Sequence, residues 1–233
     1  MQTIIDGFVK ALQLLFSGDP DVLQITIFSL QISGLATLTS LLIGLPLGTV
    51  LALGSFRSRR FWISLVNTGM ALPPVVAGLV VSLMLWRSGP LGDLHLMYTP
   101  AAILIAQTVI ASPVVTGLTV AALQQLNPRL RLQILGLGAS RWQMIVLLWK
   151  EARLPLLAAL MAGFGSIISE VGASMMVGGN LKGETRVLTT AIVLETSKGE
   201  FDVAIALSVL LLLVAYLVNL GLTMIQQRNP NRN

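Results

Sequence analysis

One acid stands out among the residues of this chain that could do chemistry. Glu170 lies inside a long apolar stretch, where an ionisable side chain is costly and is a functional candidate by default. Small residues recur at helical spacing from Ala158 to Gly172, and such a face lets another helix approach closely. We therefore expect the Glu170 carboxyl group to point into the protein and away from lipid.

Uncharged polar side chains in the same kind of stretch form a second set. Such groups can hold an anion through hydrogen bonds that still allow its release, and the equally favoured alternative is hydrogen bonding between helices. The set is Gln107, Thr108, Ser166, Ser169 and Ser174. These residues are our candidates for lining a path across the membrane.

A polar segment at residues 178–186 combines glycines with two cations. Its candidate residues are Gly179, Asn180, Lys182 and Arg186. Successive backbone N–H groups in such a loop can form a concave nest for an anion. The alternative is a turn that docks a partner protein.

Other kinds of chemistry lack their residues in this sequence. There is no cysteine, and the single histidine, His95, lies in a short polar loop, whereas a metal site needs three or four ligands. We find no paired carboxylates, no nucleophile–base set and no glycine-rich phosphate loop ending in Lys-Ser/Thr. We therefore expect neither a catalytic site nor a metal or cofactor in this chain.

The composition indicates an integral membrane protein. Hydrophobic residues make up 55% of the 233 positions and charged residues 11%, against about 25% charged in a soluble domain. The apolar runs are long and unbroken, which favours an all-helical protein over a barrel. The basic character reflects Lys and Arg retained on the cytoplasmic face and not nucleic-acid binding.

Five membrane spans are predicted in a single domain, with a core at residues 22–225. They run at 22–53, 61–86, 98–123, 155–178 and 203–225. The first is too long for a core of roughly 30 Å, so we expect it to tilt, project into water or bend at Gly44-Leu45-Pro46. The second is broken by Pro73-Pro74. Residues 1–20 hold a predicted interfacial helix.

A basic segment at residues 124–154 interrupts the apolar pattern. Asn127-Pro128 predicts a helix start, Gly136 and Gly138 its end, and Ser140 the cap of a second helix. Polar segments of this kind cannot lie in hydrocarbon, so the two short helices must face water.

The distribution of basic residues predicts the orientation. Segments 55–60, 124–154 and 226–233 hold ten Lys and Arg residues, against five on the opposite side. The positive-inside rule then places the basic segment and the C-terminus in the cytoplasm and the N-terminus outside.

The basic segment resembles a known motif. Gly138-Ala139-Ser140-Arg141-Trp142, followed by Leu154-Pro155, is similar to the cytoplasmic coupling motif of ABC importer permeases of the type I fold. The Glu-Ala-Ala that opens the family motif reads Leu132-Gln133-Ile134 here, and the Leu-Pro pair comes about one helical turn later. The resemblance makes Arg129, Arg131, Gly138, Ala139, Ser140 and Arg141 the candidate contacts to an ATPase.

Further motifs resemble the permeases for molybdate, tungstate and sulfate. They lie at residues 71–78, 89–92, 168–173 and 177–180, and residues 188–196 are most similar to the tungstate branch. The resemblance implies a homodimer in the bacterial or archaeal cytoplasmic (inner) membrane. Its expected partners are two ATPase subunits, which bind the ATP, and an extracytoplasmic oxyanion-binding protein, with lipid around it.

An oxyanion substrate has a consequence for Glu170. A carboxylate on the path would repel a dianion, so we expect a structural role, hydrogen-bonded or protonated against spans two or three. The function predicted is import of an oxyanion, tungstate first and molybdate or sulfate as alternatives. A stand-alone channel or secondary carrier is disfavoured by the water-facing helix pair and by the lack of an internal repeat.

Overall fold

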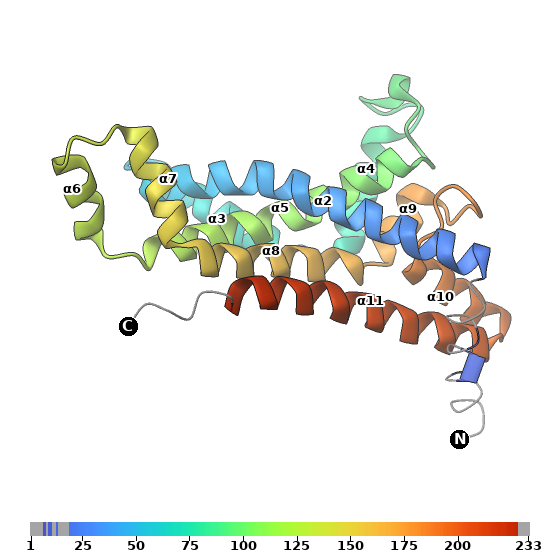
Figure 1. Cartoon of the computed structure of the whole chain (residues 1–233). Coiled ribbons are helices and arrows are strands. Elements are labelled where there is room, and N and C mark those ends of the chain that lie inside the picture. Colours follow the sequence, from blue (N-terminus) through green and yellow to red (C-terminus); the bar gives the residue numbers. More distant parts are fainter. Residues whose placement is uncertain (1–6, 8, 11–12, 14–18, 228–233) are drawn as a thin grey trace.

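The computed structural model describes residues 7, 9–10, 13 and 19–227, in which every regular element is helical (Figure 1). The predicted interfacial helix at residues 1–20 falls almost wholly outside the described residues. The elements are α2 (Pro20–Leu53), α3 (Arg59–Met70), α4 (Pro74–Leu85), η1 (Gly92–Leu94), α5 (Pro100–Gln124), α6 (Pro128–Gly136), α7 (Arg141–Glu151), α8 (Arg153–Ile168), α9 (Gly172–Gly178), α10 (Leu188–Lys198) and α11 (Phe201–Gln227).

The pair α2 and α5 forms the centre of the bundle. α2 is one helix of 34 residues that continues through Pro46 and is roughly 51 Å long. The helix is therefore longer than the membrane core, as predicted, and Pro46 does not interrupt it. Its buried face places a small residue at every fourth position, Ala36, Ser40, Gly44 and Gly48. A Cβ atom at Gly48 would lie 2.6 Å from Thr119 Cβ of α5, so only glycine permits this approach.

Two predicted spans are broken helices. α3 and α4 meet at an angle of 102°, at the break that Pro73-Pro74 predicts. α8 and α9 meet at 61°, although we expected one continuous span at residues 155–178. Among the residues that the structure describes, three helices, α2, α5 and α11, are long and apolar enough to cross a membrane, and the number of spans rises to five if each bent pair crosses as one. The count of five therefore stays a prediction.

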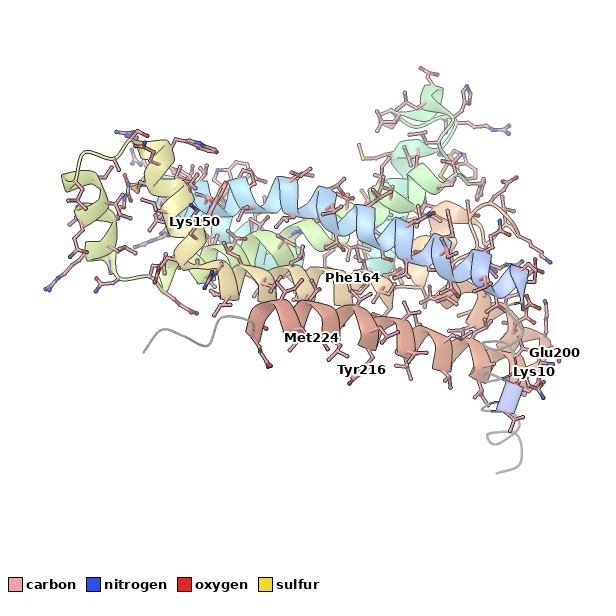
Figure 2. The ribbon with its side chains drawn as sticks, in the orientation of Figure 1. Lys10, Lys150, Phe164, Glu200, Tyr216 and Met224 are labelled. Carbon is pink, nitrogen blue, oxygen red and sulfur yellow. The ribbon has the colours of Figure 1, made fainter. Side chains whose placement is uncertain are left out.

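The short helices pack against one another beside the central pair. α4 lies against α9 so closely that a Cβ atom at Gly78 would be 2.6 Å from the Ala173 Cα atom. α10, which the sequence analysis missed, is joined to α2 by a hydrogen bond of 2.8 Å from Leu188 N to Ser29 Oγ. α11 covers α8, with Tyr216 and Met224 pointing away from the bundle (Figure 2).

Candidate functional site

The helix pair α6–α7 forms as its caps predict. The Asn127 side chain accepts a hydrogen bond of 2.9 Å from Arg129 N at the start of α6. Ser140 and Gln143 form a capping box at the start of α7, with reciprocal bonds of 3.2 and 2.8 Å. Between the helices Gly138 has φ +83°, a conformation that favours glycine. The predicted glycine turn is therefore confirmed.

The α6–α7 pair is tied to the last turns of α2. Arg131 Nη1 donates to the Leu53 carbonyl oxygen at 2.9 Å, and Trp149 Nε1 donates to Thr49 Oγ1 at 2.9 Å. A hydrophobic cluster around Leu148 joins α7 to the ends of α2 and α5. The helix pair is therefore in direct contact with α2. This geometry gives Arg131 an anchoring contact within the chain, which the sequence analysis did not foresee.

The tip of the pair exposes apolar side chains to solvent. Leu137 is 87% exposed, Leu132 70% and Trp142 65%. The flanking Arg129 and Arg141 are also exposed. Exposed apolar groups rimmed by charge are typical of a surface that docks another protein. The sequence analysis named the arginines and Gly138 as contacts but missed Leu132 and Leu137. Leu132 could have been identified, because its helical spacing places it opposite the packed Leu130 and Ile134.

Glu170 lies in the break between α8 and α9 and is 7% exposed. Its carboxylate accepts hydrogen bonds from Ala173 N, at 3.2 and 3.1 Å to the two oxygens, and from Ser174 N at 3.5 Å. The Thr189 hydroxyl of α10 donates to the Glu170 carbonyl oxygen at 2.9 Å. The carboxylate thus occupies the first turn of α9, where unpaired N–H groups favour a negative charge.

These contacts correct two expectations about Glu170. The small-residue stripe does not continue through Gly172 on one face, because the helix ends at Ile168 and restarts at Gly172. Among the described residues, the hydrogen-bond partners of the carboxylate are amides of α9, in its own predicted span, and not groups of spans two or three. The small residues instead let α4 approach, since a Cβ atom at Gly172 would lie 2.7 Å from Val75 Cγ2.

The five uncharged candidates do not form one hydrogen-bonded group among the described residues. Ser166 and Ser169 donate to carbonyl oxygens of their own helix, Gly163 and Gly165. Thr108 pairs with Thr39 of α2 at 2.7 Å, which is the interhelical alternative. Gln107 and Ser174 are 2% and 1% exposed, and Gln107 Oε1 and Ser174 Oγ have no partner in the described part of the chain. These two candidates therefore each have a buried polar atom that is not hydrogen-bonded within the described part of the chain.

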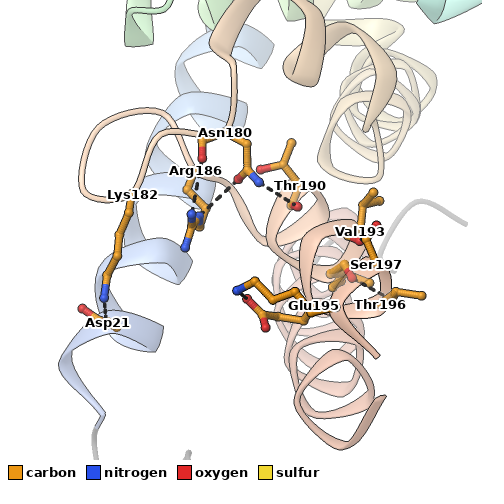
Figure 3. Close-up of polar contacts among 11 residues, drawn as sticks. Asp21, Asn180, Lys182, Arg186, Thr190, Val193, Glu195, Thr196 and Ser197 are labelled. Carbon is orange, nitrogen blue, oxygen red and sulfur yellow. Dashed lines mark hydrogen bonds and ion pairs between the residues drawn. The ribbon is translucent and has the colours of Figure 1, made fainter. Parts of the chain in front are cut away.

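The loop at residues 178–186 uses its cations internally (Figure 3). Arg186 Nε donates to Asn180 Oδ1 at 3.2 Å, and Asn180 Nδ2 donates to the Thr190 carbonyl oxygen at 3.3 Å. Lys182 pairs with Asp21 of α2. Gly179 and Asn180 both have positive φ, which supplies the tight turn. The loop is therefore built as a turn that closes over the start of α2.

Comparison with known proteins identifies relatives over almost the whole chain. Residues 44–230 match the family model described as "Binding-protein-dependent transport system inner membrane component". The "Tungstate uptake system permease protein TupB" of Peptoclostridium acidaminophilum is 37% identical, covering 97% of this chain and all of that protein. The "Sulfate transport system permease protein CysW" of Escherichia coli strain K12 is 30% identical, covering 100% and 81%.

The fold itself recurs in solved structures. A structure described as "Crystal structure of a bacterial ABC transporter involved in the import of the acidic polysaccharide alginate" has a chain of TM-score 0.73 to this one. It is 22% identical, and the match covers 97% of this chain and 84% of that chain. The likeness at this identity concerns the arrangement of helices.

Proposed function

We propose that this chain, which belongs to the family of binding-protein-dependent transport system inner membrane components, is the permease subunit of an ATP-driven tungstate importer. The observation that supports tungstate as the substrate is the 37% identity to a tungstate uptake permease, over 97% of this chain and all of that protein. The identity falls to 30% for the sulfate permease, so sulfate import by the same fold is the second candidate.

The α6–α7 pair is the part of this chain that we assign to the ATPase. Its tip presents Leu132, Leu137 and Trp142 to solvent around the Gly138 turn. Its base is hydrogen-bonded to α2 through Arg131 and Trp149. A displacement of the docked tip is then transmitted through the base to the central α2–α5 pair. ATP is bound and hydrolysed by the partner subunit.

The orientation of the chain follows from charge and supports this assignment. The ten-to-five asymmetry of basic residues favours a cytoplasmic location for α6 and α7. In Figure 1 α11 ends toward that side of the bundle, whereas α2 begins beside α10 at the far end. The start of α2 then faces outward together with the loop at residues 178–186, where an anion-binding protein would dock. Two copies of the chain form the channel.

Uptake by the assembled transporter tests the proposal. The chain is reconstituted in vesicles with its partner ATPase and an anion-binding protein, and tungstate inside the vesicles is measured by mass spectrometry of the metal. We expect accumulation that needs ATP and that equimolar sulfate leaves nearly unchanged. Accumulation of sulfate with no uptake of tungstate would replace the first candidate with the second, and uptake of neither would reject both.

A further inference from the structure

An apolar groove runs along the outside of the bundle between α2, α3 and α5. Its volume is about 800 Å³, and along α2 it extends from Ile43 to Leu51, roughly 12 Å. Six apolar side chains in its lining are 42–59% exposed. They are Ile43, Leu47, Val50, Trp62, Leu65 and Val109.

Three arginines lie at one end of this groove. Phe56 is part of the lining, and Arg57, Arg59 and Arg60 follow it directly in the sequence. Arg59 Nε donates to the carbonyl oxygen of Leu51, another lining residue, at 2.6 Å, which fixes the cluster at the groove. The groove is thus apolar along its length and positively charged at the end where the three arginines lie.

The other two arginines of this cluster, Arg57 and Arg60, have no acidic partner in the described part of the chain. Arg57 and Arg60 are exposed, and neither takes part in an ion pair among the described residues. The sequence contains no Asp or Glu between Asp21 and Asp93, nor within α5. A second copy bound here through the same surface would therefore bring arginines and no carboxylates.

We propose that the groove binds one anionic phospholipid. An acyl chain lies against Leu47, Trp62 and Leu65, and the headgroup phosphate lies between Arg57 and Arg60. Basic pockets between membrane helices bind anionic headgroups through this combination of apolar contact and charge. In the proposed orientation this site lies in the cytoplasmic leaflet of the membrane. Binding of the lipid itself does not depend on transport.

Native mass spectrometry of the full chain, released from detergent with added lipid, tests the site. The probes are phosphatidylglycerol and phosphatidylcholine with identical acyl chains. We expect one phosphatidylglycerol retained per chain in preference to phosphatidylcholine. Arg57→Gln/Arg60→Gln should lower that preference by about fivefold for each arginine removed. Arg87→Gln, which removes an exposed charge that is not part of the groove lining, should leave the preference unchanged.

A second variant separates the groove from its charge. Leu47→Trp fills the groove from an exposed position and should abolish retention of phosphatidylglycerol with all three arginines in place. Leu212→Trp, at a residue of α11 that is 70% exposed, is the matched control and should retain it.

Three results would overturn the proposal. One is equal retention of both lipids by the unmodified chain, and another is an unchanged preference in Arg57→Gln/Arg60→Gln. The third is a Leu47→Trp variant that turns a dimer into a monomer without affecting lipid retention, since a second copy would then cover the groove. Failure of tungstate uptake leaves these measurements intact, because they need no ATPase and no substrate.

Discussion

Two helix ends in this protein are capped by side chains of opposite charge. One cap comes from distant parts of the sequence, and the other comes from a residue next to the helix that it caps. At the end of α2, Arg59 and Arg131 donate to the carbonyl oxygens of Leu51 and Leu53. At the start of α9, the Glu170 carboxylate accepts from backbone amides three and four residues ahead. Both satisfy groups that a helix leaves unpaired, with the charge that the helix dipole favours.

The difference lies in what each cap connects. The arginines come from α3 and α6, so the end of α2 is held by two other elements, one of them half of the α6–α7 pair. Glu170 caps its own chain locally and joins α10 only through its backbone carbonyl. Loss of the first cap should therefore affect communication between elements, and loss of the second should affect mainly stability.

The largest effect is expected from Glu170→Leu. The change strands the amides of Ala173 and Ser174, at about 1–3 kcal/mol for each buried group, so we expect a loss of about 3 kcal/mol. Glu170→Gln keeps one acceptor oxygen and should lose less than half as much. Thermal unfolding in detergent and tungstate uptake measure the two properties. Abolished uptake in a stable Glu170→Gln variant would show that the carboxylate works in transport itself.

A smaller loss is expected where the central pair is closest. Gly48→Ala places a Cβ atom 2.6 Å from Thr119 Cβ, and we expect a loss of about 2 kcal/mol from overpacking. Gly34→Ala, on the same helix, meets nothing within 4 Å and should be neutral or slightly stabilising. Unfolding midpoints of the two variants compare the sites directly. Equal midpoints would mean that α2 and α5 can move apart to accept the added methyl group without loss of stability.

Gly138→Val tests the turn between α6 and α7. A side chain at φ +83° costs about 1–2 kcal/mol, although no atom lies within 4 Å of the added Cβ. We therefore expect the chain to insert and fold, while ATP hydrolysis by the assembled transporter no longer drives uptake. Gly136→Val, with equal space and no positive φ, is the control. Normal uptake by Gly138→Val would contradict the coupling role of the turn.

The smallest effect on stability is expected from Arg131→Gln. Its hydrogen bond to Leu53 is exposed, so the isolated chain should lose less than about 1 kcal/mol. Uptake per ATP hydrolysed should fall nonetheless, because α6 is released from α2. Arg129→Gln should leave the stability of the isolated chain unchanged, since no side-chain bond of Arg129 is found among the described residues. If both variants behave alike in the isolated chain, Arg131 does not anchor the pair.

Local signals determined much of this protein from sequence alone. The helix starts at Asn127-Pro128 and Ser140, the glycine turn at residue 138 and the break at Pro73-Pro74 depend on residues a few positions apart. Caps and prolines act through the backbone within one turn, so their effect can be predicted without the fold. Composition likewise determined that the chain is helical and lies in a membrane, and the motifs identified its family.

Tertiary structure alone decided the break at Glu170, the helix α10 and the anchoring of Arg131. Residues 155–178 have the composition of one continuous helix, yet the chain bends where Thr189 of α10 donates to the Glu170 carbonyl oxygen and Val75 of α4 packs against Gly172. Arg131 bonds to a carbonyl 78 positions away, and Lys182 to an acid 161 positions away. Such partners are brought together by the packing of whole helices, which no local pattern encodes.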